Sequence, residues 1–315
     1  MIAAGDLPAS TQATLAEAFR VHRLSQSEAI PPEVAASVRG IARGGHFAID
    51  RALIESLPKL EIIANFGVGY DGIALATCAT RGVVVTNTPD VLTEEIADTA
   101  LGLLLMTVRE LSAAERYLRA GSWARQGPYP LTRATLRDRT VGIAGLGRIG
   151  IAIARRLRAM QVPVVYHNRQ RRDDVAWRHY ADLATMAADV DTLICVLPGG
   201  PGTTRLIDAG ILAALGPRGI LINVGRGSVV DQAALIAALR DGTIMAAGLD
   251  VFADEPEVPP ELMALPNAVL LPHVGSASIH TRDAMGQLCA DNLVSWFSAG
   301  KPITPVPETP WKAKG

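Results

Sequence analysis

Cysteine is scarce in this sequence. The 315 residues include only Cys78, Cys195 and Cys289, which lie far apart and form no CxxC motif or Cys/His cluster. This excludes a disulfide framework and gives no support to a zinc site. We therefore expect no bound metal, and we expect a reducing, cytoplasmic location.

An excess of charge of one sign is also absent. Lys and Arg number 30 and Asp and Glu number 31, a net charge of −1. Nucleic-acid binding needs a basic surface that neutralises phosphates, so we expect small-molecule partners and no nucleic acid. The longest apolar run, "ALGLLLMTV", falls far short of the roughly 20 residues that cross a bilayer. The N-terminus lacks the pattern of a signal peptide, and we expect no membrane association.

Hydrophobic residues make up 49% of the chain, enough for two cores at this length. From about residue 140, short β-branched runs alternate with segments of helical period, which indicates consecutive βαβ units and a buried parallel sheet. Earlier, "LEIIANFG" and "GVVVTNTP" resemble strands of a smaller α/β domain. The fold class predicted is α/β, with two Rossmann-like domains, parallel sheets and an active site in the interdomain cleft.

Two helices are expected where the chain passes from one domain to the other. One runs from about Thr93, as N-cap, to Arg119, is apolar nearly all round and ends before Gly121. The other runs from about Arg282 to Ser298, after which the chain returns to the first domain. We predict a discontinuous substrate-binding domain of residues 1–98 and 284–315, and a dinucleotide-binding domain of residues 99–283.

The segment "VGIAGLGRIG" contains a GxGxxG pattern formed by Gly145, Gly147 and Gly150, directly after a β-run and before a helical run. Such glycines allow a tight turn and close approach of the backbone to a pyrophosphate at a helix N-terminus. We predict a dinucleotide site here. The alternative is a glycine-rich turn with no ligand.

The acid that normally follows this pattern by about 20 residues, and binds the ribose of NAD, is missing. The stretch "VVYHNRQRR" has Asn168, Arg169, Arg171 and Arg172 there instead. Guanidinium groups match a 2′-phosphate, so the stretch predicts NADP as cofactor, with NADPH preferred over NADH. Arg169 is the first choice of phosphate partner, and Asn168 would hold the ribose edge. Alternatively, the arginines only balance the two aspartates that follow, at 173 and 174.

Reactive side chains follow three later strand-like runs. These are Arg226 in "NVGRGSVVD", Asp250 and Glu255 in "GLDVFADEP", and His273 in "LPHVGSAS". Reduction of a ketone by hydride requires a proton donor and a positive group near the oxygen, which suits His273 and Arg226. Glu255 would orient the imidazole. The alternatives are structural: a histidine that caps a strand, a solvated glutamate, and an arginine paired with Asp231.

Six segments together resemble the D-isomer-specific 2-hydroxyacid dehydrogenase family. They are "NFGVGYDGI", "NTPDVLTEEIAD", "GIAGLGRIG", "INVGRGSVVD", "AGLDVFADEP" and "LPHVGSAS", and they span residues 65 to about 278. The arginine-rich loop and residues 119–143 are similar to the glyoxylate/hydroxypyruvate reductase branch. The resemblance implies that Arg226, Glu255 and His273 are the catalytic residues, that the product is a D-2-hydroxy acid, and that the protein is a homodimer.

The resemblance also implies the binding residues. The predicted substrate-binding set is Phe66, Val68, Gly69, Trp123, Arg226 and His273, with backbone amides of the loop at Val68 holding the substrate carboxylate. The predicted cofactor-binding set is Thr99, Gly145, Leu146, Gly147, Arg148, Ile149, Gly150, Asn168, Arg169, Arg171, Arg172, Leu197, Pro198, Thr204, Val224, Gly225, Arg226, Asp250, His273 and Gly275. Trp123 would reach a partner subunit's site, or else anchor the interdomain arm as a buried residue.

The function predicted is NADPH-dependent reduction of small 2-oxo acids, glyoxylate or hydroxypyruvate, with His273 as proton donor. One alternative is a family member that reduces a larger 2-oxo acid such as phenylpyruvate. Another is a nicotinamide-responsive binding module of the corepressor type, which the arginine-rich loop disfavours. Formate dehydrogenases of the family have glutamine in place of the glutamate at 255, and phosphoglycerate dehydrogenases use NAD.

Overall fold

The computed structural model describes residues 1–25, 28–309 and 311, which form two compact units. Unit 1 comprises Met1–Leu92 and Ala277–Gly315, and unit 2 comprises Thr93–Ser276. The sequence predicts that the chain changes domain after residue 98 and after residue 283, whereas in the structure it does so after Leu92 and after Ser276. The first boundary differs because Arg156 forms ion pairs with Glu94 and Asp98, so the first turn of helix α5 (Thr93–Val108) belongs to unit 2.

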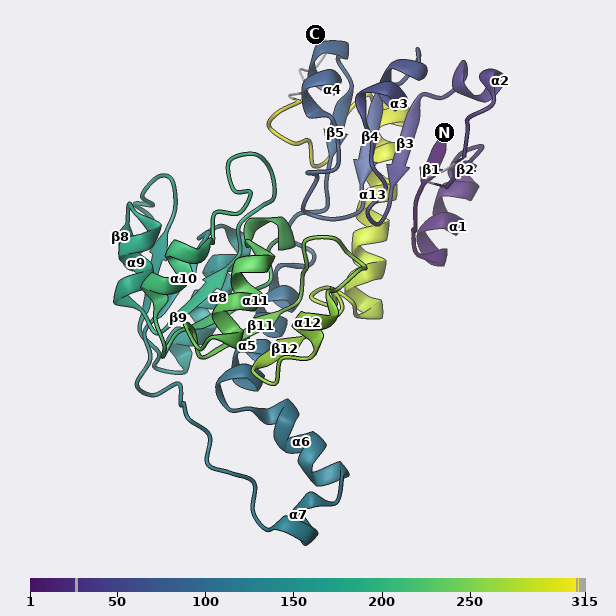
Figure 1. Cartoon of the computed structure of the whole chain (residues 1–315). Coiled ribbons are helices and arrows are strands. Elements are labelled where there is room, and N and C mark those ends of the chain that lie inside the picture. The colour runs from purple at the N-terminus through teal and green to yellow at the C-terminus, as the bar shows by residue number, and fades with distance from the viewer. Residues whose placement is uncertain (26–27, 310, 312–315) are drawn as a thin grey trace. The chain divides into compact units, whose positions relative to one another are not determined.

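Unit 1 is built on a five-stranded parallel sheet with the order β2-β1-β3-β4-β5 (Figure 1). The strands are β1 (Ile2–Ala4), β2 (His22–Leu24), β3 (Gly40–Arg43), β4 (Ile62–Asn65) and β5 (Val84–Thr86). The helices are α1 (Ala9–Ala18), α2 (Pro32–Ala35), α3 (Arg51–Ser56), α4 (Leu75–Arg81) and α13 (Ile279–Ala299). Ile2 lies opposite Ile41, and Ile41 opposite Ile63, all buried. Such β-branched, fully buried rows are what a parallel sheet requires.

The last helix and the segment after it complete unit 1. Helix α13 packs on α1, β3 and β4, and it begins three residues earlier than predicted because the Ser278 hydroxyl accepts a hydrogen bond from Thr281 N–H. The following segment lies against β5. There Val306 N–H donates to Val85 O at 2.9 Å, and the Thr309 hydroxyl accepts from Val85 N–H.

Unit 2 is built on a seven-stranded parallel sheet with the order β12-β11-β10-β9-β6-β7-β8 (Figure 1). Its strands are β6 (Val141–Ala144), β7 (Val164–His167), β8 (Arg178–Tyr180), β9 (Thr192–Cys195), β10 (Ile220–Asn223), β11 (Ala246–Leu249) and β12 (Ala268–Leu270). The helices that follow β6 are α8 (Arg148–Ala159), α9 (Leu183–Asp189), α10 (Ala209–Leu215), α11 (Gln232–Arg240) and α12 (Pro260–Met263). The predicted α/β class with two parallel sheets is confirmed.

The single helix predicted from Thr93 to Arg119 is wrong. The chain breaks after α5, Glu110 adopts a left-handed conformation at φ 53°, and α6 (Leu111–Arg119) and α7 (Ser122–Gln126) follow in a new direction (Figure 1). Contacts from further along the chain hold this arrangement. The Tyr129 hydroxyl donates to the Glu110 carboxylate, and the Tyr129 ring packs edge-on against Tyr117.

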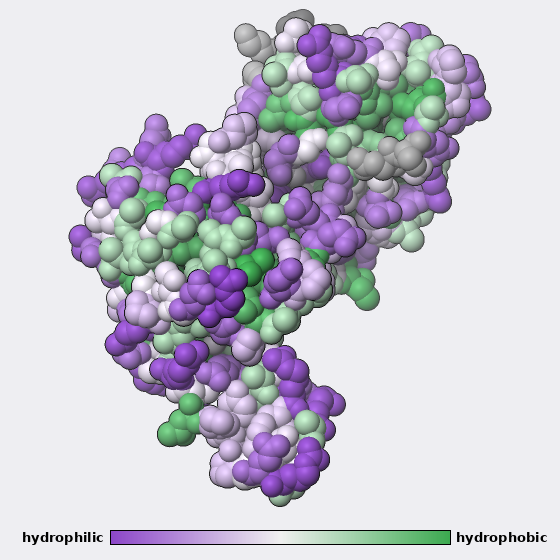
Figure 2. Space-filling view, in the orientation of Figure 1, coloured by the Kyte–Doolittle hydropathy of each residue, from purple (hydrophilic) through white to green (hydrophobic). Residues whose placement is uncertain are grey.

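The arm formed by α6 and α7 differs from α5 in burial. Six residues of α5 are buried, whereas no residue of α6 is. The visible face of the arm carries mostly hydrophilic side chains (Figure 2), although Leu111, Leu118 and Trp123 are exposed. Among the residues that the structure describes, no helix combines the length and hydropathy needed to span a bilayer.

Candidate functional site

The glycine turn joins β6 to α8, and its three glycines have different reasons to be glycine. Gly145 has φ +101°, and a Cβ on Gly150 would lie 2.3 Å from the Gly145 carbonyl oxygen. Both are therefore required by the protein's own packing. Gly147 has an ordinary φ of −84° and nothing within 4 Å of where its Cβ would be. The open space beside Gly147, at the N-terminus of a 12-residue helix, fits a pyrophosphate group.

The loop after β7 is joined to this turn. The Asn168 side-chain oxygen accepts from Leu146 N–H at 2.7 Å, and the backbone N–H of Arg172 donates to the Tyr166 hydroxyl at 2.9 Å. These contacts place the arginine-rich segment beside the glycine turn, as a ribose-recognition loop requires. The Arg172 guanidinium itself donates to the carbonyl of Leu146 at 3.3 Å.

The three arginines of the loop differ in their hydrogen bonds and ion pairs. Arg172 forms two hydrogen bonds with Asp174, which raise the pKa of Arg172, and Arg171 lies 4.0 Å from Asp173 in an exposed pair. The alternative of internal charge balance therefore applies to Arg172. Arg169 is exposed and has no hydrogen bond or ion pair with any residue that the structure describes. It is the arginine most available to an added anion.

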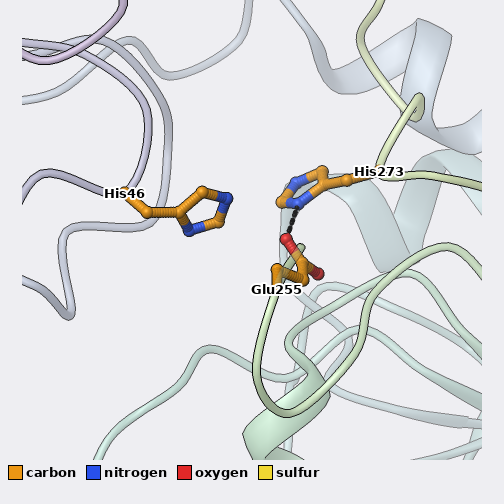
Figure 3. Close-up of side chains that lie close together, drawn as sticks. All are labelled: His46, Glu255 and His273. Atoms are coloured by element: carbon orange, nitrogen blue, oxygen red, sulfur yellow. Dashed lines mark hydrogen bonds and ion pairs between the residues drawn. The ribbon is translucent and has the colours of Figure 1, made fainter. Parts of the chain in front are cut away.

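His273 and Glu255 form a hydrogen-bonded pair (Figure 3). His273 Nδ1 lies 2.6 Å from Glu255 Oε2, while Glu255 Oε1 accepts from Phe252 N–H at 2.8 Å. The glutamate side chain is 12% exposed and the histidine side chain 37%, so the carboxylate is enclosed and the imidazole is accessible. His273 has a positive φ of 52°, a conformation that is uncommon outside glycine and concentrates at functional sites.

Asp250 supports the same segment. It is 2% exposed, and its carboxylate accepts from Val274 N–H at 2.8 Å and Gly275 N–H at 2.9 Å, while its carbonyl accepts from His273 N–H. Burial raises the pKa of Asp250, although these hydrogen bonds oppose the shift. The Thr99 hydroxyl donates to the Gly275 carbonyl at 3.3 Å, which ties α5 to this segment.

Arg226 lies on the turn after β10. Its Nη1 donates to the Gly225 carbonyl at 2.8 Å, and its own carbonyl accepts from the Asn223 side chain. A Cβ on Gly225 would lie 2.6 Å from the Leu197 carbonyl, so this turn and the Leu197 turn pack closely. Asp231, the suggested structural partner of Arg226, caps α11 by accepting from Ala234 N–H.

Most predicted residues of unit 2 lie at one edge of its sheet, just beyond the carboxyl ends of the parallel strands. The glycine turn follows β6, Asn168 follows β7, Leu197 and Pro198 follow β9, Arg226 follows β10, Asp250 follows β11 and His273 follows β12. Ligands of open α/β sheets bind at this edge. Thr204 lies in the turn after Pro198, where its hydroxyl donates to the Gly200 carbonyl. Trp123 lies apart, on the arm, and is 61% exposed, so it is not a buried anchor within this chain.

The predicted substrate residues of unit 1 follow β4. Phe66 is buried with the Arg282 guanidinium 5.7 Å from its ring centre, and Val68 and Gly69 lie in the loop that comes next. Asn65 and Asn87, whose side chains hold this loop, are not among the predicted site residues. The signal for them in the sequence is their place at the ends of strand-like runs, directly before "FGVG" and "TPD".

The chain is similar in sequence and in structure to known proteins. Residues 101–275 match the family model described as D-isomer specific 2-hydroxyacid dehydrogenase, NAD binding domain. The chain is 45% identical over 270 residues to glyoxylate/hydroxypyruvate reductase A of Arabidopsis thaliana, and 44% identical over 273 residues to hydroxyphenylpyruvate reductase of Plectranthus scutellarioides, with 86% of each chain covered in both cases. A crystal structure of an NADPH-dependent glyoxylate/hydroxypyruvate reductase from Sinorhizobium meliloti, in complex with NADP and malonate, superposes with a TM-score of 0.96 at 50% identity. That match covers 100% of this chain and 98% of the other.

Proposed function

Because this chain belongs to the D-isomer-specific 2-hydroxyacid dehydrogenase family, we propose that it is an NADPH-dependent reductase of small 2-oxo acids, with glyoxylate and hydroxypyruvate as its substrates and D-2-hydroxy acids as its products. The observation that carries the proposal is the contact of 2.6 Å between His273 Nδ1 and Glu255 Oε2, at the same sheet edge as the glycine turn. An oriented imidazole at the same sheet edge as a nucleotide-binding turn suits proton transfer during carbonyl reduction.

In the proposed mechanism, a dinucleotide held at the glycine turn would supply the hydride that reduces the carbonyl carbon of the substrate. Negative charge then develops on the carbonyl oxygen, and His273 donates a proton to it from Nε2, because Nδ1 is engaged by Glu255. The enclosed Glu255 carboxylate holds the ring orientation and stabilises its positive charge before transfer. Arg226 provides a permanent positive charge for the carboxylate and the developing alkoxide of the substrate.

The choice of NADPH is supported by the loop after β7. A 2′-phosphate carries negative charge that a ribose acid would repel, and this loop has none at Asn168 or Arg169. Arg169 is the proposed phosphate partner, since Arg172 is already bonded to Asp174. The Sinorhizobium meliloti relative, at 50% identity, is NADPH-dependent and has NADP bound.

A second candidate substrate is a larger, aromatic 2-oxo acid. The observation that favours it is the 44% identity to hydroxyphenylpyruvate reductase, close to the 45% identity to the glyoxylate/hydroxypyruvate reductase. Comparison of kcat/KM for glyoxylate, hydroxypyruvate, pyruvate and phenylpyruvate separates the two candidates. Hydroxypyruvate or glyoxylate should give the highest value.

The cofactor assignment is tested by steady-state kinetics with NADPH and NADH in wild type and in Arg169→Ala. Loss of one charge-assisted hydrogen bond to the 2′-phosphate should raise KM for NADPH about tenfold or more and leave KM for NADH unchanged. Arg178→Ala is a matched control, because Arg178 is an exposed arginine of the neighbouring strand that packs over Tyr180. A higher kcat/KM with NADH in wild type would refute the assignment. Nucleotide binding without turnover of any 2-oxo acid would favour the corepressor type.

We also retain the homodimer and the reducing cytoplasm as proposals. Leu111, Leu118 and Trp123 are large apolar residues exposed on the arm, which a partner subunit would cover. The three cysteines are buried thiols, which fits a reducing compartment.

A further inference from the structure

The loop formed by Gly67, Val68 and Gly69, called here the carboxylate loop, has all three of its carbonyl oxygens bonded to side-chain amides. Asn65 Nδ2 donates to the carbonyls of Gly67 and Gly69, at 3.0 Å each. Asn87 Nδ2 donates to the carbonyl of Val68, also at 3.0 Å. The two asparagines come from the ends of neighbouring strands, β4 and β5. The orientation of each peptide plane in the loop is thereby set by a side chain.

A buried arginine sets the orientation of Asn65. Arg43 is 6% exposed and Asn65 1% exposed. Arg43 Nη1 donates to Asn65 Oδ1, and its Nε donates to the Phe47 carbonyl. A carboxamide has an oxygen end and a nitrogen end, so a guanidinium at the oxygen end obliges the nitrogen end to face the loop. Asn65 is thus fixed as a donor to the two glycine carbonyls.

The consequence is a pair of backbone donors with no acceptor of their own. The amide of Gly67 is bonded to the Thr88 hydroxyl at 3.0 Å. Within the part of the chain that the structure describes, the N–H groups of Val68 and Gly69 have no hydrogen-bond acceptor, and both residues are half-buried. Partly enclosed N–H groups normally find a partner, and two adjacent ones form a concave anion site.

We propose that Asn65 and Asn87, with Arg43 behind Asn65, are positioning residues that preorganise the carboxylate loop for the substrate carboxylate. They touch neither substrate nor cofactor. They act by holding three carbonyls away from the anion, so that the Val68 and Gly69 amides face it. The inference rests on the proposed function, since it takes the ligand to be the carboxylate of a 2-oxo acid.

The expected effect is on binding more than on chemistry. If an asparagine is lost, the loop spends less time in the competent arrangement, and the apparent affinity for the anion falls by that fraction. Asn87→Ala should raise KM for glyoxylate about tenfold, with kcat changed less than about threefold, because the same amides hold ground state and transition state. The Ki of oxalate, an unreactive analogue competing with glyoxylate, should rise in parallel. The Kd of NADPH should stay the same.

A second variant, Asn65→Leu, and a control variant, Asn267→Ala, complete the experiment. Asn65→Leu keeps the side-chain volume and removes both polar ends. Asn87→Ala keeps the test valid if loss of the buried hydrogen bond from Arg43 to position 65 unfolds the Asn65→Leu variant. The control is Asn267→Ala, because Asn267 is a half-buried asparagine that donates to two carbonyls, of Leu239 and Met245, away from this loop. It should leave KM and Ki at wild-type values.

The outcomes separate this inference from the proposed function. Unchanged KM and Ki in Asn87→Ala, or equal changes in Asn267→Ala, would overturn the positioning role while wild-type turnover leaves the function intact. Absence of wild-type turnover would overturn the proposed function. In that case calorimetric titration of oxalate into the protein with NADPH still tests the loop. An equal Kd of oxalate for wild type and Asn87→Ala would overturn the positioning role.

Discussion

His273 is held through both its backbone and its side chain. Its backbone N–H donates to the Asp250 carbonyl at 2.9 Å, in a left-handed conformation, and its ring is bonded to Glu255. Glu255 is in turn fixed by Phe252 N–H. A side chain held through both its backbone and its ring loses little freedom when a substrate arrives, which is the condition for efficient proton transfer.

Replacement of His273 by Gln removes the titratable proton and retains a polar side chain of similar size. We expect kcat with NADPH and hydroxypyruvate, measured by steady-state kinetics, to fall by about 100-fold or more. Glu255→Gln keeps an acceptor for Phe252 N–H but loses the negative charge, so its kcat should lie between those of wild type and the His273 variant. Near-wild-type turnover in His273→Gln would assign the proton to another group.

Helix α8 is the element on which the nucleotide site depends. It begins at the glycine turn, and Arg156 in its third turn bonds Asp98 of α5 at 2.7 Å. The Arg156 side chain is 22% exposed and also forms an ion pair with Glu94, so a partly buried ion-pair group joins the two helices. The hydrogen bonds to Asp98 and Glu94 raise the pKa of Arg156, with the largest contribution from Asp98. Helix α8 is therefore held in place by α5 as well as by β6.

Alanine substitutions at two glycines of the turn before α8 should have different effects, one on stability and one on cofactor binding. Gly150→Ala places a Cβ against the Gly145 carbonyl, so the unfolding free energy should fall by about 1–3 kcal/mol. Gly147→Ala meets no protein atom, so its thermal midpoint should stay near that of wild type while the Kd of NADPH rises about tenfold or more. Thermal unfolding and fluorescence titration measure the two effects. If Gly147→Ala bound NADPH as wild type does, the pyrophosphate would lie elsewhere.

At the scale of the whole molecule, the described residues form three apolar cores, one in unit 1 and two in unit 2, and the chain contributes to the core of unit 1 from both of its ends. Val306 is 2% exposed in the core of unit 1, together with Ile63 and Val85, more than 200 residues away in sequence. An isolated bridge pairs Pro305 with Thr86, which covers the edge of β5. An exposed strand edge is a site for unwanted pairing, so this returning segment protects unit 1 as well as adding apolar contacts.

Val306→Ala should therefore lower the stability of unit 1 by about 1–3 kcal/mol, through lost burial and an incompletely filled cavity. Urea unfolding followed by circular dichroism gives the change. The Kd of NADPH should be unaltered, because its proposed ligands all lie in unit 2. Unfolding identical to wild type would show that the returning segment adds nothing to the core.

Local patterns were enough to predict the parallel α/β class, the glycine turn and the arginines after β7. Each depends on residues close together in the chain: apolar runs for buried strands, glycine spacing for a turn, and distance from that turn for the ribose position. The pairing of Glu255 with His273 was also expected, although its catalytic role stays a prediction.

Other features depend on contacts between residues far apart in the sequence, which only the tertiary structure shows. Tyr129 holds the break at Glu110 that the helical pattern of residues 93–119 did not show. The Asp174 carboxylate engages Arg172 and leaves Arg169 exposed, a distinction that the string of arginines does not contain. Arg43 and Asn65, 22 positions apart, face one another only because β3 and β4 are adjacent in register. Side-chain partners of this kind depend on strand order and packing, which follow from the free energy of the whole fold.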